Sequence, residues 1–190
     1  MARSKPSLTR AVYPGTFDPV TYGHLDVIKR ARKIFGEVVV AVAHNPGKAP
    51  LFSVEERVSL LRQATRSITG VVVDHFDSLV VDYVRRQRAR VMIRGLRMLS
   101  DFEYEFQMAL TNRKLADEVE TIFLMPSEAY AYVSARLIKE AGALGADLSA
   151  FVPPFAAEAM RRKLQGLPHR STGAPTRSPQ VGRRNGSRRS

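Results

Sequence analysis

The sequence predicts a doubly wound α/β fold with a five-stranded parallel sheet and one extra C-terminal helix. Short apolar runs rich in β-branched residues alternate with stretches of helical periodicity. The apolar runs continue over consecutive positions, as expected for parallel strands that helices cover on both faces. The chain has 190 residues, of which 44% are hydrophobic, so it can bury one core of ordinary size.

The elements follow in a regular order. Strands are predicted at residues 11–14, 37–43, 71–76, 90–95 and 121–126, and helices at 24–35, 54–67, 78–88, 101–116, 134–144 and 154–165. Ser53 followed by Glu56 is a capping-box sequence, and Ser78 stands where an N-cap should precede the third helix. In such a fold, ligands bind beyond the carboxyl ends of the strands, at a switch point of the sheet.

The positive charge is concentrated at the two ends of the chain. Of the net charge of +12, residues 1–10 carry +3 and residues 166–190 carry +6. We therefore predict a flexible extension at 1–10, one folded domain at 11–165 and a disordered basic tail at 166–190. Because the domain itself is only weakly basic, nucleic-acid binding is expected at most weakly and through the tail.

Composition also excludes several kinds of site. The chain has no cysteine, which excludes disulfides, thiolate zinc sites and cysteine nucleophiles. Its four histidines show no metal-ligand spacing, so no protein-held metal is expected. No apolar stretch approaches the roughly 18 residues of a spanning helix, and the first ten residues lack an apolar core, so we expect no membrane and a cytoplasmic location.

The end of the first strand carries the first candidate site. Thr16 follows that strand, and Thr21-Tyr22-Gly23-His24 opens the next helix. A helix N-terminus favours a phosphate, and His24 can donate a hydrogen bond to a phosphoryl oxygen. Neither phosphate-binding pattern, G-x-x-x-x-G-K-[ST] nor G-x-G-x-x-G, occurs. For this segment taken alone, a turn with a capping histidine is the simpler interpretation.

Three further segments offer groups that suit phosphates. Lys48 lies in the loop after the second strand, where a solvated lysine is the simpler interpretation. Arg94 and Arg97 follow the fourth strand, and they can grip phosphates or form surface ion pairs with Asp101 or Glu103. The helix that starts near Ser134 can offer backbone N–H groups to phosphates, or Ser134 can be a plain N-cap.

Taken together, the segments YPGTFDPVTYGH, FSVEER with the Lys48 loop, IRGLR with DFEYE, and FLMPSEAYAYVSARLIKE resemble the phosphopantetheine adenylyltransferases. These are nucleotidyltransferases marked by a [TH]-x-G-H motif, and the resemblance covers residues 11–165. It implies a Rossmann-like nucleotidyltransferase fold and, in coenzyme A biosynthesis, transfer of AMP from ATP to 4′-phosphopantetheine. The products are dephospho-coenzyme A and pyrophosphate, magnesium accompanies ATP, and relatives form homohexamers.

The resemblance also implies roles for individual residues. His24 matches the residue that stabilises the transition state, and Thr16 a residue that touches both substrates. Lys48, Val80 and Arg94 match contacts to phosphopantetheine. The positions that match the surroundings of ATP are Phe17, His24, Gly95, Leu96, Arg97, Glu105, Tyr130, Ala131, Tyr132, Val133, Ser134, Ala135 and Arg136. Relatives usually have consecutive serines where this chain has Ser134-Ala135-Arg136, and tryptophan is more usual at position 130.

Two other functions stay open at this point. In the first, the protein is a member of the same superfamily that acts on another phosphate acceptor, such as nicotinamide mononucleotide or, with CTP, glycerol 3-phosphate. In the second, the protein is a nucleic-acid-binding module that uses its arginine-rich tail.

Overall fold

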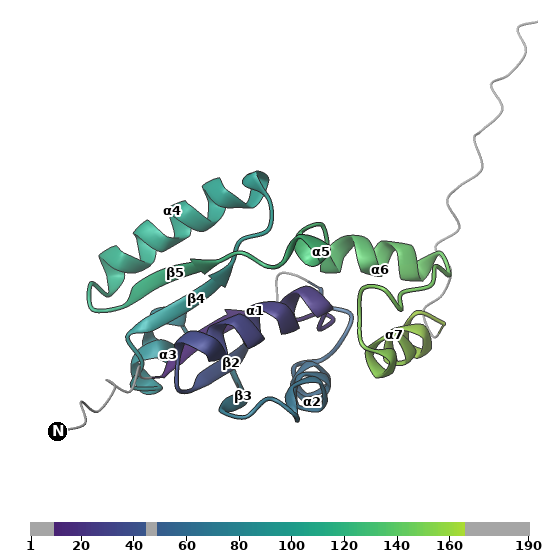
Figure 1. Ribbon diagram of the computed structural model, residues 1–190, viewed down its shortest axis with the longest axis horizontal. Helices are drawn as coiled ribbons and strands as arrows, with labels where there is room; N and C mark the ends of the chain where they lie inside the picture. Colours follow the sequence, from purple (N-terminus) through teal and green to yellow (C-terminus); the bar gives the residue numbers. More distant parts are fainter. Residues whose placement is uncertain (1–9, 45–48, 166–190) are drawn as a thin grey trace, which may run out of the picture.

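The computed structural model describes residues 10–44 and 49–165 (Figure 1). Five parallel strands form one sheet in the order β3-β2-β1-β4-β5, which confirms the predicted fold class. The strands are β1 (Ala11–Gly15), β2 (Val38–Ala43), β3 (Val71–Phe76), β4 (Val91–Gly95) and β5 (Glu120–Leu124). The helices are α1 (Tyr22–Ile34), α2 (Val54–Thr65), α3 (Val80–Arg86), α4 (Leu99–Leu115), α5 (Glu128–Ala131), α6 (Ala135–Ala143) and α7 (Pro154–Gln165).

The side chains of β2 alternate between two hydrophobic cores. Val38, Val40 and Val42 belong to a core that also includes residues of α1, α2, α6 and α7. Val39 and Ala41 face the other way, into a core shared with α3. This period of two explains the continuous apolar run of the sequence, because both faces of the strand are buried. Within the described ranges, no helix is long and apolar enough to cross a membrane.

The central pair of strands separates along its length. β1 pairs with β2 over five positions, but it pairs with β4 only at Ala11–Val91 and Val12–Met92. Beyond these two pairs, the carboxyl ends of β1 and β4 diverge. This point is the topological switch of the sheet, where a doubly wound fold has its crevice. Figure 1 shows α5 and α6 lying beyond the carboxyl ends of β4 and β5.

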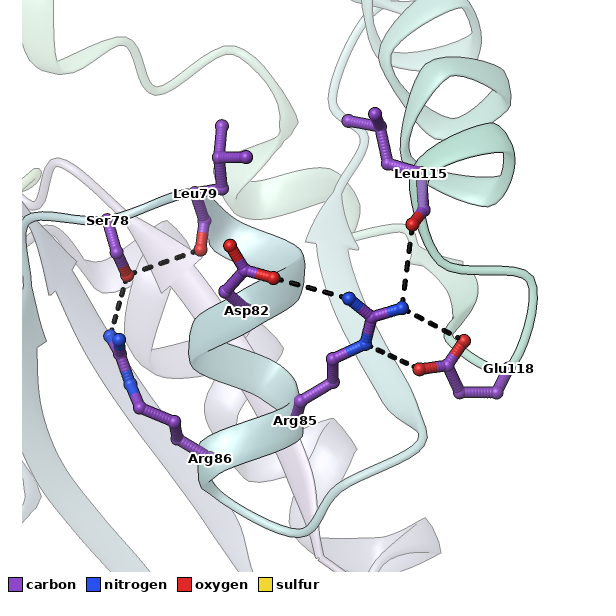
Figure 2. A network of polar contacts seen from close by, with 7 residues as sticks. All are labelled: Ser78, Leu79, Asp82, Arg85, Arg86, Leu115 and Glu118. Atoms are coloured by element: carbon purple, nitrogen blue, oxygen red, sulfur yellow. Dashed lines mark hydrogen bonds and ion pairs between the residues drawn. The ribbon is translucent and has the colours of Figure 1, made fainter.

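The start of α3 differs from the sequence prediction. The helix begins at Val80 with Leu79 at the N-cap position, and Ser78 does not cap it. The Ser78 hydroxyl instead donates to the Leu79 carbonyl at 3.3 Å and accepts a hydrogen bond from Arg86 at 2.6 Å (Figure 2). The predicted N-cap was therefore wrong, because the helix starts two residues after Ser78 and the Ser78 hydroxyl bonds to Arg86 at the end of the helix instead.

Arg85 joins α3 to the connection between α4 and β5. Its guanidinium donates to the Glu118 carboxylate at 2.5 and 3.3 Å and to the Leu115 carbonyl at 3.5 Å, as Figure 2 shows. The Arg85 hydrogen bond lowers the pKa of Glu118 to about 2. At neutral pH both partners of this exposed pair are therefore charged.

The remaining boundaries agree with the sequence to within two residues, with one omission. The capping box of Ser53 and Glu56 at the start of α2 is confirmed. Helix α5 was not predicted, because four residues are too few to show a helical period.

Arg57 of α2 is buried beneath the loops that follow β1 and β2. Its side chain is 1% exposed and donates to four backbone carbonyls at 2.8–3.2 Å. These carbonyls belong to Thr16, Ala43, Phe52 and Ser53. One guanidinium therefore ties together the carboxyl ends of β1 and β2 and the start of α2.

We expect Arg57→Met to lower the free energy of unfolding by about 2–4 kcal/mol, because it leaves buried carbonyls without donors. Urea denaturation followed by circular dichroism measures this loss. Arg62→Met changes an exposed arginine of the same helix and should stay within about 0.5 kcal/mol of the wild type. Equal stability of the two variants would contradict the role given to Arg57.

Candidate active site

A cavity of about 660 Å³ lies at the diverging carboxyl ends of β1 and β4, a volume typical of small-molecule sites. Most of the residues expected to bind substrates line it. These are Thr16, Phe17, His24, Arg94, Gly95, Arg97, Val133, Ser134, Ala135 and Arg136. Segments far apart in the sequence therefore meet at the edge of the sheet where the sequence places the site.

Other candidate residues do not line this cavity. They are Val80, Leu96, Glu105, Tyr130, Ala131 and Tyr132, and Lys48 falls outside the described residues. Val80 packs against the core on the α3 side of the sheet. The Tyr130 ring lies against Tyr22, with 6.1 Å between the ring centroids, and Glu105 binds Arg94.

Asp18 and Lys139 line the cavity but were not singled out from the sequence. Asp18 is 4% exposed, and its carboxylate accepts from the backbone N–H groups of Leu51 and Phe52 at 2.9 Å each. The Lys139 ammonium donates to the same carboxylate at 2.6 Å. The one sequence signal for Lys139 is its place three residues after Arg136, which puts both on one face of α6.

His24 takes part in the N-cap of α1. The Thr21 hydroxyl accepts from the His24 backbone N–H at 3.2 Å, and the Thr21 backbone N–H donates to His24 Nδ1 at 3.0 Å. This is a capping box in which histidine replaces the usual Glu or Gln. Because Nδ1 accepts a backbone proton, the neutral ring carries its own proton on Nε2.

The surroundings of His24 keep it uncharged. Burial, aided by the positive charge of Arg97, lowers the pKa of His24 to about 4. At neutral pH the residue therefore presents an Nε2–H donor and no positive charge. Nδ1 therefore takes part in the N-cap of α1, and Nε2–H is left to face a ligand.

Phe17 holds the His24 ring from the side of the β1 loop. Its ring packs edge-on against Tyr13 and His24, with centroid distances of 5.3 and 5.0 Å. Its backbone is in the left-handed region, with φ of 50°. A Cβ on Gly15 would lie 2.9 Å from the Phe17 ring, so only glycine at position 15 leaves room for this arrangement.

The cavity suits an anion. Of the charged side chains that line it among the described residues, four are basic and one is acidic: Arg94, Arg97, Arg136 and Lys139, against Asp18. Arg97 also donates to the Val133 carbonyl at 2.8 Å, which ties the segment before α6 to the start of α4. Guanidinium groups, an ammonium group and the first turn of a nine-residue helix together are typical of phosphate recognition.

The low pKa of His24 predicts how stability depends on pH. The unfolded chain binds a proton at this residue near pH 6.5, whereas the folded chain does so only near pH 4. Protonation therefore favours the unfolded state between these values, and this histidine makes stability fall as pH falls from about 6.5 to about 4.

His24→Gln tests this, because glutamine can still complete the capping box. Urea denaturation at pH 7 and pH 5 should show that the wild type loses more stability than the variant. Parallel losses in the two proteins would mean that His24 titrates normally.

The comparisons with known proteins give the family of the chain. Residues 12–141 match the family described as cytidylyltransferase-like. A protein of Caldanaerobacter subterraneus subsp. tengcongensis named phosphopantetheine adenylyltransferase is 54% identical over 155 residues, covering 82% of this chain and 97% of that protein. A protein of Alkalilimnicola ehrlichii with the same name is 50% identical over 158 residues, covering 82% and 91% of the two chains.

Solved structures share the fold at low identity. A putative nicotinate-nucleotide adenylyltransferase from Vibrio parahaemolyticus has a TM-score of 0.61 at 15% identity, covering 82% of this chain and 94% of that one. The nicotinic acid mononucleotide adenylyltransferase of Plasmodium falciparum has a TM-score of 0.60 at 12% identity, covering 81% and 95%. On its sequence and its fold, the chain belongs to the phosphopantetheine adenylyltransferase family of cytidylyltransferase-like nucleotidyltransferases.

Proposed function

We propose that this protein transfers AMP from ATP to 4′-phosphopantetheine, giving dephospho-coenzyme A and pyrophosphate. The observation that carries the proposal is the basic cavity at the switch point, where the uncharged His24 lies among arginines. The names of relatives at 54% and 50% identity supply the acceptor.

The reaction needs one displacement at phosphorus. An oxygen of the acceptor phosphate forms a bond to the α-phosphorus of ATP as the bond to the α,β-bridging oxygen breaks. The electron pair of that bond leaves with pyrophosphate. No covalent enzyme intermediate is required, so the protein contributes orientation and stabilisation of charge.

The residues of the cavity suit these tasks. His24 Nε2–H donates to an α-phosphoryl oxygen as negative charge builds there. Arg94 binds the phosphate of the acceptor, whereas Arg97 and the start of α6 bind the phosphates of ATP. Hydroxyls are absent at positions 135 and 136, so backbone N–H groups and the Arg136 guanidinium replace their contacts.

Magnesium enters this proposal as part of the substrate, MgATP. The described residues contain no group of three histidines or carboxylates that could hold a metal ion. Among the described residues, Asp18 is the one carboxylate that lines the cavity, and both its oxygens already accept hydrogen bonds from N–H groups. The metal would therefore be held mainly by the ATP phosphates.

We also propose that the protein is a homo-oligomer, with the hexamer implied by the resemblance as the expected state. Helix α4 supports this, because it exposes large apolar side chains along its length. Leu99 is 86% exposed, and Phe102, Phe106, Leu110 and Leu115 are 39–52% exposed. Light scattering on the purified protein gives the mass that decides the state.

The product identifies the acceptor. The protein is incubated with magnesium and ATP or CTP and, in separate reactions, with 4′-phosphopantetheine, nicotinamide mononucleotide or glycerol 3-phosphate. We expect pyrophosphate release and an adenylylated product, identified by mass, with ATP and phosphopantetheine. Turnover of another acceptor alone would overturn the proposed substrate.

A truncation after residue 165 should keep this activity, and loss of RNA binding on truncation would reveal a separate role of the tail.

His24→Ala should reduce turnover by about 10²–10³-fold and change the KM of either substrate little, because the lost Nε2–H donor acts mainly on the transition state. Pyrophosphate release measures both quantities. Since alanine also removes the ring nitrogen that accepts from the Thr21 backbone N–H, unfolding by urea checks that the variant is folded. Turnover close to that of the wild type would remove Nε2–H from the mechanism.

A further inference from the structure

Arg94 and Glu105 form a two-point ion pair at the edge of the cavity. Arg94 Nε donates to one Glu105 oxygen at 2.7 Å, and Arg94 Nη2 donates to the other at 2.6 Å. The side chains are 23% and 13% exposed. The pair is therefore partly shielded from water. Two parallel hydrogen bonds fix the plane of the Arg94 guanidinium as well as its position.

A third bond fixes the same guanidinium on its other side. Arg94 Nη1 donates to the Pro14 carbonyl at 3.0 Å. Arg94 stands on β4 and Pro14 on β1, so this bond crosses the gap where the two strands no longer pair. The residue is thereby anchored to α4 through Glu105 and to the central strand through Pro14.

These bonds leave part of the guanidinium free. An arginine has five N–H donors, and three are engaged by Glu105 and Pro14. The other two belong to Nη1 and Nη2, one on each. Two donors on adjacent nitrogens match two oxygens of one phosphate. Arg94 lines the cavity and Glu105 does not, so the carboxylate holds the guanidinium from outside the ligand space.

We propose that Glu105 is a positioning residue that orients Arg94 so that its two remaining donors bind the phosphate of the acceptor. The assignment rests on the proposed function, which supplies that acceptor. It differs from the role near ATP that the resemblance gives to Glu105. Each role predicts a different kinetic effect, so one set of variants decides between them.

Glu105→Gln is the central variant. It removes the negative charge and one of the two acceptors, so the guanidinium loses its fixed plane. We expect the KM for 4′-phosphopantetheine to rise about tenfold or more, with the KM for ATP within about twofold and kcat within about threefold of the wild type. Glu103→Gln is the matched control, because it removes the same charge from an exposed position of the same helix.

A double-mutant cycle with Arg94→Ala isolates the positioning role. If Glu105 acts through Arg94, adding Glu105→Gln to Arg94→Ala should change the acceptor KM by less than about twofold. Unfolding by urea checks each variant. Glu105→Asp, which keeps a shorter carboxylate, serves in the same cycle if the amide variant does not fold.

Four results would overturn the assignment. The first is a rise in the KM for ATP, with that for phosphopantetheine unchanged, which would place Glu105 at the nucleotide. The second is a full effect of Glu105→Gln in the Arg94→Ala background. The third is a wild-type protein that makes no dephospho-coenzyme A, which would overturn the proposed function as well. Normal wild-type turnover with an unchanged Glu105→Gln variant would overturn this assignment alone.

Discussion

The divergence of β1 and β4 is the constraint on which the site depends. A parallel sheet that stays paired to its end leaves no space between its central strands, whereas here pairing stops at Val12 and Met92. The opening needs side chains that bridge it without filling it. Arg94 does so by reaching from β4 to the Pro14 carbonyl. Gly95 has no side chain and leaves room for the Tyr13 hydroxyl, which would lie 3.2 Å from a Cβ at that position.

Two buried charges hold the loops that frame this opening, and they do so in complementary ways. Backbone groups in buried loops need partners, as those in strands do. Arg57 supplies donors to four carbonyls of these loops, and the Asp18 carboxylate supplies acceptors to the N–H groups of Leu51 and Phe52. The Arg57 cation therefore serves the carbonyls and the Asp18 anion serves the N–H groups. Together they replace the regular hydrogen bonds of a sheet, which the loops cannot form.

The sequence was sufficient for the fold and for most of the candidate residues that the structure brings to one cavity, because local patterns indicate both. Continuous β-branched runs predicted the buried strands, and the segments around Thr21–His24 and Arg94 predicted the family that the comparisons confirm. It was not sufficient for contacts between distant residues. Lys139 meets Asp18 across 121 positions, and no periodicity relates them. The proton position on His24 likewise depends on a backbone N–H, which residue types do not specify.

The pairing of the basic residues explains how four cations can line one cavity. Each cation has a carboxylate partner: Glu105 for Arg94, Asp101 for Arg97, Glu140 for Arg136 and Asp18 for Lys139. These pairs reduce the repulsion among the cations. Apart from Asp18, these carboxylates are not among the residues that line the cavity. Selection of phosphate groups then depends on the N–H donors that these pairs leave unengaged, more than on an excess of positive charge.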